Sequence, residues 1–226
     1  MSAQDPDSDL SRLNRESSGD WVGLHPWTEA VLDRALFWAE VSHGAFDPTV
    51  SRRGWRDVAL SPGRARLGAG RTLCFDGIAK GFAVDRAVEA MIAAGATEGL
   101  VNAGGDLRGF GDRDWTVEVP DPITRLPIRT FLIRDQAAAT SAVAAGGLSA
   151  QDRARLPGRM ADIFSATVVT ASAMDADALT KIALADAPRL ETCLEIAGAR
   201  TLRLFRRGLR AEWLTLAPGG LAPAAG

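Results

Sequence analysis

Apolar residues recur along this chain at the spacings typical of helices and of strands. Trp27, Val31, Ala35 and Trp38 follow one another at intervals of three and four, which predicts one buried face of a helix over Pro26–Val41. Other segments show helical spacing or capping residues, and the first of them ends at Gly95 as a C-terminal cap. These further predicted helices cover residues 78–94, 172–185 and 190–197.

Shorter apolar runs, some alternating with polar residues, predict strands. They fall within 58–74 and at 100–102, 115–119, 131–133, 166–170, 201–206 and 211–216. Since helices and strands do not alternate strictly, the pattern favours an α+β fold: a single domain with a mixed, largely antiparallel sheet and flanking helices. We expect this domain to span 10–216. The ends at 1–9 and 217–226 are expected to be flexible, because their polar or Pro/Gly-rich composition buries little apolar surface.

The composition is that of an ordinary folded chain, with 46% of its 226 residues hydrophobic and 24% charged. Its 26 basic and 28 acidic residues nearly cancel without forming runs, which argues against nucleic acid as a partner. Cys74 and Cys193 lie far apart in apolar surroundings and are interpreted as small core residues. No apolar stretch reaches about eighteen residues and the start is polar and acidic, so we expect no transmembrane segment and a cytoplasmic location for the chain as given. A longer natural start would make the protein periplasmic or membrane-associated.

The glycine-rich segment 102–106, Asn-Ala-Gly-Gly-Asp, follows a predicted strand, as the phosphate-binding loop of a dinucleotide fold would. That fold needs a helix directly after the glycines. This chain is instead predicted to run through a charged turn into the strand at 115–119. Taken alone, the segment is therefore interpreted as a tight turn.

Lys80 lies in the first turn of a predicted helix, where the helix dipole disfavours a cation. An anionic group is therefore expected nearby. The local sequence leaves two candidates open, which are Asp76, four residues earlier and a natural N-cap, or a phosphate bound at the helix N-terminus.

Two aspartates near the start of the helix at 172–185 point in different directions, because residues two apart lie about 200° apart on a helix. Ser172 and Asp175 have the spacing of a capping box, so Asp175 is predicted to satisfy backbone donors. For Asp177 two alternatives remain. It forms an i,i+4 ion pair with Lys181, or it binds a hard cation together with the Thr180 oxygen.

Segment 46–49, Phe-Asp-Pro-Thr, predicts a turn, since aspartate before proline favours a turn and can cap it locally. His25 and His43 have no Cys, Asp or Ser neighbour at a catalytic spacing. Neither histidine is therefore a candidate proton shuttle.

Five motifs follow one another along the chain. They are Ser-Asp-Leu-Ser-Arg-Leu-Asn at 8–14, Gly-Ala-Phe-Asp-Pro-Thr-Val at 44–50, Asp-Gly-Ile-Ala-Lys-Gly-Phe-Ala-Val-Asp at 76–85, Val-Asn-Ala-Gly-Gly-Asp at 101–106 and Ala-Met-Asp-Ala-Asp-Ala-Leu-Thr at 173–180. Read together, they resemble the ApbE family, the FAD:protein FMN transferases, over nearly the whole chain up to Ala197. The resemblance implies an enzyme that binds FAD and Mg²⁺, transfers the FMN half to a threonine hydroxyl in a flavinylation motif of a partner flavoprotein, and releases AMP.

The resemblance also implies roles for single residues. Lys80, beside the pyrophosphate, and Asp177 would be catalytic, while Asp177, Thr180 and the main-chain carbonyl of Ala79 would bind the metal. The FAD pocket would comprise Ala45, Phe46, Asp47, Asp76, Gly77, Lys80, Phe82, Asn102, Gly104, Gly105 and Asp106.

The chain departs from the family pattern at three places. Family members usually carry a further strand and helix before the motif at 8–14, and commonly a His-Ile-x-Asp-Pro motif where this chain has Ser-Ala-Gln-Asp-Arg at 149–153. Lys181 stands where many members have a threonine, four residues after Asp177, and its ammonium would take part of a cation's space and weaken metal binding. Two alternative functions are an FAD pyrophosphatase that yields FMN and AMP, and a non-catalytic flavin-binding protein.

Overall fold

The computed structural model describes residues 1–16, 19–49, 53–121, 124, 126–142, 163–185, 187–205 and 211–215. Its helices are α1 (Asp9–Arg15), α2 (Pro26–Val41), α3 (Ala79–Ala93), α5 (Ala173–Leu184) and α6 (Leu190–Ala197), with the 3-10 helix η1 (Gly54–Asp57). Its strands are β1 (Val22–Gly23), β2 (Val58–Ser61), β3 (Arg64–Leu67), β4 (Gly99–Ala103), β5 (Asp106–Phe110), β6 (Trp115–Pro120), β7 (Pro127–Ile133), β8 (Ala137–Ala142), β9 (Ile163–Thr170), β10 (Arg200–Phe205) and β11 (Ala211–Thr215). Within these ranges no helix combines the length and the apolar character needed to cross a bilayer.

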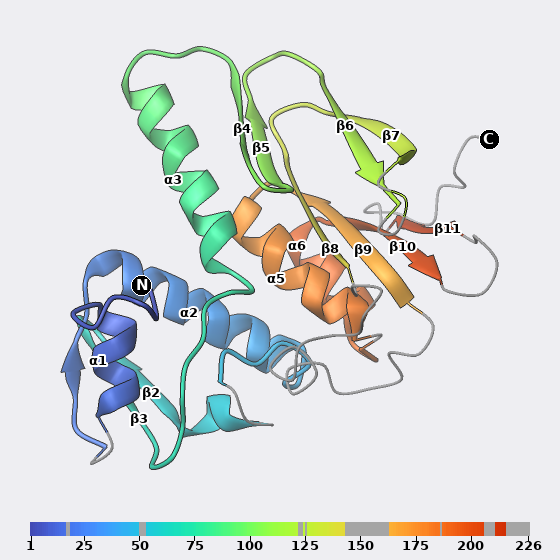
Figure 1. Ribbon diagram of the computed structural model, residues 1–226. Coiled ribbons are helices and arrows are strands. Elements are labelled where there is room, and N and C mark those ends of the chain that lie inside the picture. Colours follow the sequence, from blue (N-terminus) through green and yellow to red (C-terminus); the bar gives the residue numbers. More distant parts are fainter. Residues whose placement is uncertain are drawn as a thin grey trace.

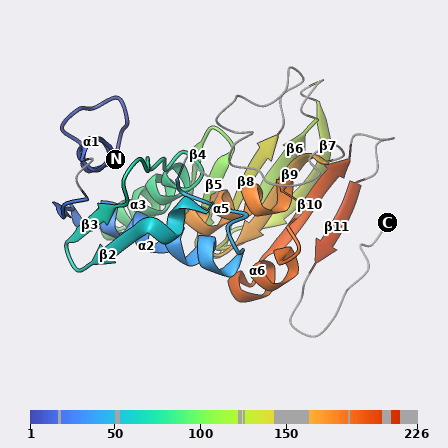
Figure 2. The same cartoon turned by 90° about the horizontal axis from the view of Figure 1, so that it is seen from below.

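Six strands form the central sheet in the order β11-β10-β9-β8-β5-β4, and each neighbouring pair is antiparallel. Helix α3 packs over β4 and β5, and helix α5 packs over β8 and β9 (Figure 1). Helix α2 packs against α6 and β2, and it lies farther from the central sheet than α5 does (Figure 2). The predicted α+β fold with a largely antiparallel sheet is confirmed.

Both faces of the central sheet are buried at β9. Successive side chains of a strand point to opposite sides, so the residues of β9 alternate between two cores. Ala166 and Val168 belong to the main core under the helices. Val169 belongs to a second core, together with Leu107 of β5 and Ile133 of β7. The hairpin β6–β7 therefore covers the face of the sheet opposite the helices.

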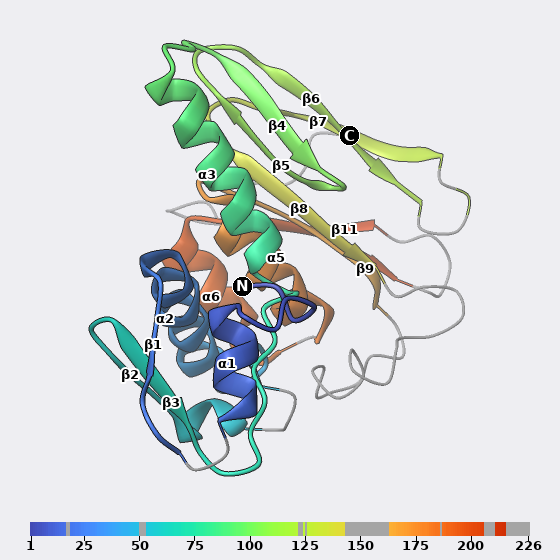
Figure 3. The ribbon, with the colours of Figure 1, turned by 60° about the vertical axis from the view of Figure 1, so that its left-hand side comes forward.

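A separate three-stranded sheet, in the order β1-β3-β2, lies beside α1 and α2 (Figure 3). Of the four residues predicted to form the buried stripe of α2, Val31, Ala35 and Trp38 are fully buried. The prediction is wrong for Trp27, which is 52% exposed. Trp27 lies in the first turn of α2, and its ring packs edge-on against Phe82 of α3 instead of entering the core.

The four predicted helices begin and end within one residue of their predicted bounds, and every predicted strand is present. The sequence did not predict α1, β1, β5 or β8. One prediction is wrong here, because the chain enters β5 directly after the glycine turn instead of running through a charged turn to residue 115. Two of these unpredicted strands, β5 and β8, are interior strands of the central six-stranded sheet. Burial on two faces there removes the alternation of apolar and polar residues that identifies a strand. Strand β8 is also rich in alanine, which favours strands weakly.

The N-terminal residues contact the rest of the chain. Ser8 is buried and its hydroxyl accepts the backbone N–H of Ser11, which caps α1. Asn14 of α1 exchanges two hydrogen bonds with the backbone of Leu73, at 2.9 and 2.7 Å. These contacts do not measure motion, so the flexibility expected for residues 1–9 stays a prediction. Residues 217–226, for which flexibility was also expected, lie outside the described residues.

The two cysteines differ in their surroundings. Cys193 is fully buried, as predicted for a core residue, and burial raises the pKa of its thiol to about 11. Cys74 is only partly buried. Its interpretation as a core residue is therefore too strong.

Helices α3 and α5 meet closely at their N-terminal ends. A Cβ at Gly81 would lie 2.0 Å from the carbonyl oxygen of Ala173, so only glycine permits this approach. One turn further along α3, the Asp85 carboxylate accepts the backbone N–H groups of Ala173 and Met174, both at 3.0 Å. It also accepts the Ser172 hydroxyl at 2.8 Å. Asp85 therefore caps α5 from a different helix, which satisfies donors that the start of a helix leaves free.

Asp85→Ala should lower the free energy of unfolding by about 3 kcal/mol, since it removes the cap of α5 and leaves the guanidinium of Arg108, 2.9 Å from Asp85, without its carboxylate. Chemical denaturation followed by circular dichroism measures this change. Asp33→Ala, at an exposed position of α2, is the control and should change stability by less than about 0.5 kcal/mol. Equal effects of the two substitutions would show that Asp85 is not needed as a cap.

Candidate functional site

Lys80 is the second residue of α3, and its ammonium donates to Asp106 Oδ2 at 2.6 Å. Asp106 is the first residue of β5, and its side chain is 2% exposed. The N-cap residue of α3 is Ile78, which makes no side-chain capping bond, so the interpretation of Asp76 as the N-cap is wrong. Tertiary contact thus provides Lys80 with an anionic partner that the local sequence did not indicate.

The charges around Lys80 and Asp106 act on each other. Burial opposes the charge of Lys80, but the hydrogen bond to Asp106 and the negative charges of Asp177, Asp106 and Asp76 outweigh it and raise its pKa. Burial also raises the pKa of Asp106, and the charge of Asp177 adds to this, while Lys80 and Lys181 act in the opposite direction. Charged residues at the start of β5, at the start of α3 and along α5 therefore form one electrostatic cluster.

Asp177 is fully buried on α5, and its Oδ1 accepts a hydrogen bond from the Lys181 ammonium at 3.1 Å. The predicted i,i+4 pair between these residues is therefore present. Lys181 also donates to Ser141 Oγ of β8 at 2.6 Å and to Thr180 Oγ1 at 3.2 Å. Asp177 Oδ2 is buried and has no hydrogen-bond partner among the described residues.

The segment before α3 lies between α5 and the turn at 46–49. A Cβ at Gly77 would lie 3.3 Å from Lys181 Cε and 3.4 Å from Phe46 Cε2. Phe46 and Gly77 belong to two different motifs of the sequence, and Lys181 directly follows a third motif, in the last turn of α5. The fold therefore brings these three segments together beside the start of α3.

The turn at 46–49 forms as predicted. Asp47 Oδ1 accepts the backbone N–H of Thr49 at 2.9 Å and its hydroxyl at 2.7 Å. Burial raises the pKa of Asp47, while hydrogen bonds from Thr49 and from the backbone of Trp55 and Gly54 act in the opposite direction. Ala45 and Phe46 beside it are buried as well.

The glycine-rich segment forms the turn between β4 and β5, which confirms its interpretation as a tight turn. Gly104 and Gly105 have φ values of 70° and 104°, which favour glycine. The Asn102 side chain accepts the Gly105 N–H at 3.1 Å. Asn102 and Gly104 are exposed, and the turn ends at the buried Asp106.

The prediction that Asp175 caps α5 is wrong in part. Ser172 does accept the Asp175 N–H at 3.3 Å, as an N-cap should. The Asp175 carboxylate, however, binds Arg34 of α2 through two hydrogen bonds, at 2.6 and 2.8 Å, and accepts the Trp38 indole N–H at 2.7 Å. Since Asp175 points to α2 and Asp177 points to Lys181, the predicted divergence of the two aspartates is confirmed.

Sequence reasoning missed Ser141, because it lies on the unpredicted strand β8, and it gave Asp85 no role although Asp85 ends one of the five motifs. No local signal indicates either contact, since the partners are distant in sequence. The histidines bind other groups: His25 Nδ1 caps α2 by accepting the Trp27 N–H, and His43 contacts Arg189. The segment 149–153, where the family has its histidine motif, lies outside the described residues.

The ligand set that the resemblance implies for Mg²⁺ does not fit a metal ion in this arrangement. Lys181 already binds Asp177 Oδ1 and Thr180 Oγ1, two of the three side-chain oxygens of that set, and only Asp177 Oδ2 has no hydrogen-bond partner among the described residues. The described residues contain no group of three or more His, Cys, Asp or Glu side chains that could hold a metal. Ala79 is the first residue of α3, and its carbonyl remains a predicted ligand.

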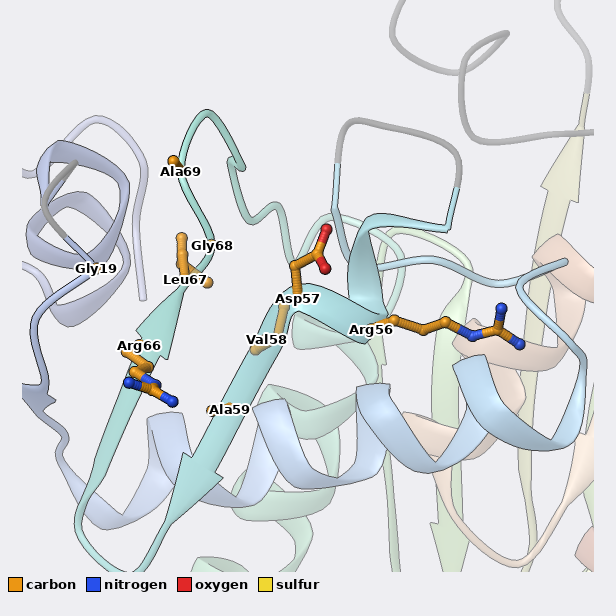
Figure 4. A pocket seen from close by; sticks show the side chains of 9 residues that line it. All are labelled: Gly19, Arg56, Asp57, Val58, Ala59, Arg66, Leu67, Gly68 and Ala69. Carbon is orange, nitrogen blue, oxygen red and sulfur yellow. The ribbon is translucent and has the colours of Figure 1, made fainter.

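A surface pocket lies apart from this cluster, beside the small sheet (Figure 4). It contains no residue of the predicted site. Its lining residues come from η1, β2, β3 and the segments next to them: Gly19, Arg56, Asp57, Val58, Ala59, Arg66, Leu67, Gly68 and Ala69.

Comparison with known proteins agrees with the motifs. The chain matches the model of the ApbE family over residues 1–53 and 50–195. It belongs to the ApbE family. Among curated proteins, it is similar to the FAD:protein FMN transferase of Treponema pallidum (strain Nichols), with 28% identity over an alignment that covers 62% of this chain. That alignment covers 52% of the relative, so the chain matches about half the length of the curated protein.

Solved structures of this family share the fold. The ApbE protein of Thermotoga maritima MSB8 superposes with a TM-score of 0.81 at 24% identity, covering 94% of this chain and 83% of that chain. The apo form of the flavinyl transferase ApbE of Pseudomonas stutzeri gives a TM-score of 0.79 at 18% identity, with 95% and 80% covered. The flavin transferase ApbE of Vibrio cholerae gives 0.79 at 20% identity, with 94% and 82% covered. The ApbE fold thus accounts for nearly all of this chain.

Lys80→Met should lower stability near neutral pH and leave it almost unchanged at about pH 4, close to the pKa of an aspartate in an unfolded chain. Without Lys80, the folded-state pKa of Asp106 rises further above its unfolded value, so the folded state binds more protons and its stability falls as pH rises. Thermal melts at the two pH values measure this difference.

Lys80→Arg keeps the positive charge and should show a smaller dependence on pH. If Lys80→Met lost the same stability at both pH values, the ion pair with Asp106 would not be the cause.

Proposed function

We propose that this chain transfers FMN from FAD to a threonine hydroxyl of a partner flavoprotein and releases AMP. The FAD:protein FMN transferase activity of the Treponema relative and membership of the ApbE family support this reaction. The observation that carries the proposal is the meeting of separate motifs at one place. A side chain at position 77 would meet both Phe46 and Lys181, and the Asp106 carboxylate that binds Lys80 is also affected by the charge of Asp177.

In this reaction the threonine oxygen forms a bond to the phosphorus of the FMN half. The bond between that phosphorus and the oxygen bridging the two phosphates breaks, AMP leaves with the bridging oxygen, and the hydroxyl proton is released. Transfer of a phosphoryl group depends mainly on positioning and on neutralising the negative charge of its oxygens. Positive side chains held at a fixed place are therefore the groups that this chemistry needs.

Lys80 is suited to the pyrophosphate. It lies in the first turn of α3, where backbone N–H groups and the helix dipole also favour an anion. Asp106 holds its ammonium at 2.6 Å, and the charges of Asp106 and Asp177 keep it protonated. About half of the Lys80 side chain remains exposed, so it can reach a ligand.

We assign the FAD contacts to the segments around this cluster. The buried turn with Ala45, Phe46 and Asp47 reaches the segment before α3 through Phe46, and the exposed β4–β5 turn with Asn102, Gly104 and Gly105 ends at Asp106, which binds Lys80. Asp76, Gly77 and Phe82 flank the start of α3. Of the side-chain oxygens that the resemblance implies for Mg²⁺, Asp177 Oδ1 and Thr180 Oγ1 are bound to Lys181.

The direct test incubates the protein with FAD and a peptide that carries one threonine, with the same peptide carrying valine as control. Chromatography measures AMP, and mass spectrometry measures the peptide. We expect AMP together with a threonine peptide heavier by FMN less one water, and an unchanged valine peptide. AMP and free FMN without a peptide adduct would indicate a pyrophosphatase, and bound FAD without AMP would indicate a non-catalytic flavin-binding protein.

Asp177→Asn should lower AMP release by about a hundredfold or more while the protein stays folded, because it removes the charge that positions Lys181 and supports Lys80. Asp175→Asn is the matched control on the same helix, since it weakens the bond to Arg34 but lies outside the cluster. It should lower stability by about 1 kcal/mol and keep turnover per folded molecule. Comparable loss of turnover in both variants would remove the special role of Asp177.

A further inference from the structure

The ammonium of Lys181 is fixed by hydrogen bonds to three oxygens. Its three N–H donors meet three oxygens, Ser141 Oγ at 2.6 Å, Asp177 Oδ1 at 3.1 Å and Thr180 Oγ1 at 3.2 Å. An ammonium has three donors and no acceptor, so this set satisfies it completely. The aliphatic part of Lys181 fills the space beside Gly77, where an added Cβ would lie 3.3 Å from Lys181 Cε.

The hydroxyl of Thr180 has no free lone pair for a metal ion. Its single hydrogen is donated to the Asp177 carbonyl at 2.7 Å. The bond of 2.7 Å to Ser141 must then be donated by Ser141, and the remaining lone pair accepts from Lys181. A hydroxyl has one donor and two acceptor positions, so all three are used. A metal ion could bind Thr180 only by displacing Lys181 or Ser141.

The cluster contains formal charges of both signs, with one negative charge in excess. Asp76, Asp106 and Asp177 carry the negative charges, and Lys80 and Lys181 carry the positive charges. Asp106 and Asp177 are buried, and buried charges need partners of opposite sign. A divalent ion at Asp177 would lie next to the Lys181 ammonium, which repels it at short range.

We propose that Lys181 supplies the positive charge that the resemblance assigns to Mg²⁺, so that this chain cleaves FAD without a divalent cation. The inference rests on the proposed function. Lys181 then belongs to the FAD-binding machinery, where its ammonium faces the pyrophosphate from α5 while Lys80 faces it from α3. Ser141 and Asp177 position that ammonium.

The test measures AMP release from FAD by the wild-type protein in EDTA and in Mg²⁺, and separately the binding of Mn²⁺ by electron paramagnetic resonance. Wild type is expected to release AMP in EDTA at a rate within about threefold of the rate in Mg²⁺, since its charge comes from the chain. It should bind Mn²⁺ weakly. AMP release that occurs only with Mg²⁺ would overturn the role of Lys181 and leave the proposed function standing.

Two variants at this position sharpen the result. Lys181→Thr removes the ammonium and adds a second hydroxyl, so it should bind Mn²⁺ at least about tenfold more tightly than wild type and release AMP only with a divalent ion. Lys181→Met keeps the length without charge or oxygen and should lose AMP release in EDTA. Equal Mn²⁺ binding by wild type and Lys181→Thr would contradict the inference.

The binding measurement also separates the two proposals. If the wild type released no AMP under either condition, the proposed function would fail. Mn²⁺ binding would then still decide the point about Lys181, because tight binding by wild type overturns it and binding gained only in Lys181→Thr supports it. Circular dichroism confirms that each variant is folded.

Discussion

The close crossing of α3 and α5 is the constraint on which the rest of this structure depends. Gly81 has no side chain to keep the two backbones apart, and Asp85 binds the free N–H groups at the start of α5. Lys80 precedes Gly81 directly, and Asp177 lies one turn into α5. The contact between the helices therefore sets the distance between the functional groups. A change of one methyl group at Gly81 would move both helices.

The site also depends on the pairing of opposite charges, which the close crossing of α3 and α5 makes possible. The cluster draws Lys80 from α3, Asp106 from β5, and Asp177 and Lys181 from α5. Two carboxylates this deeply buried would be costly if each had no positive partner. The raised pKa of Asp106 reflects that cost, since burial and the charge of Asp177 both act against its ionised form. The four groups thus support one another.

The comparison with solved ApbE structures separates fold from chemistry. A TM-score of 0.81 at 24% identity shows that the same arrangement of helices and strands tolerates extensive substitution. Within that arrangement, Lys181 places an ammonium against Asp177, Thr180 and Ser141. The shared fold fixes the backbone, whereas the charges that can neutralise a phosphate depend on single side chains such as Lys181.

The sequence by itself determined the four long helices and most strands, since spacing and capping residues act between near neighbours. Its ordered motifs also indicated the family and named Lys80, Asp106 and Asp177. Only the tertiary structure decided which groups bind each other: Lys80 binds Asp106 instead of Asp76, and α5 is capped by Asp85, 88 residues from Ala173. The positions of strands β5 and β8 likewise became known only from the tertiary structure, because both are buried on two faces inside the central sheet. Contacts between distant residues leave no local pattern, because each residue satisfies its local geometry whichever distant partner it meets.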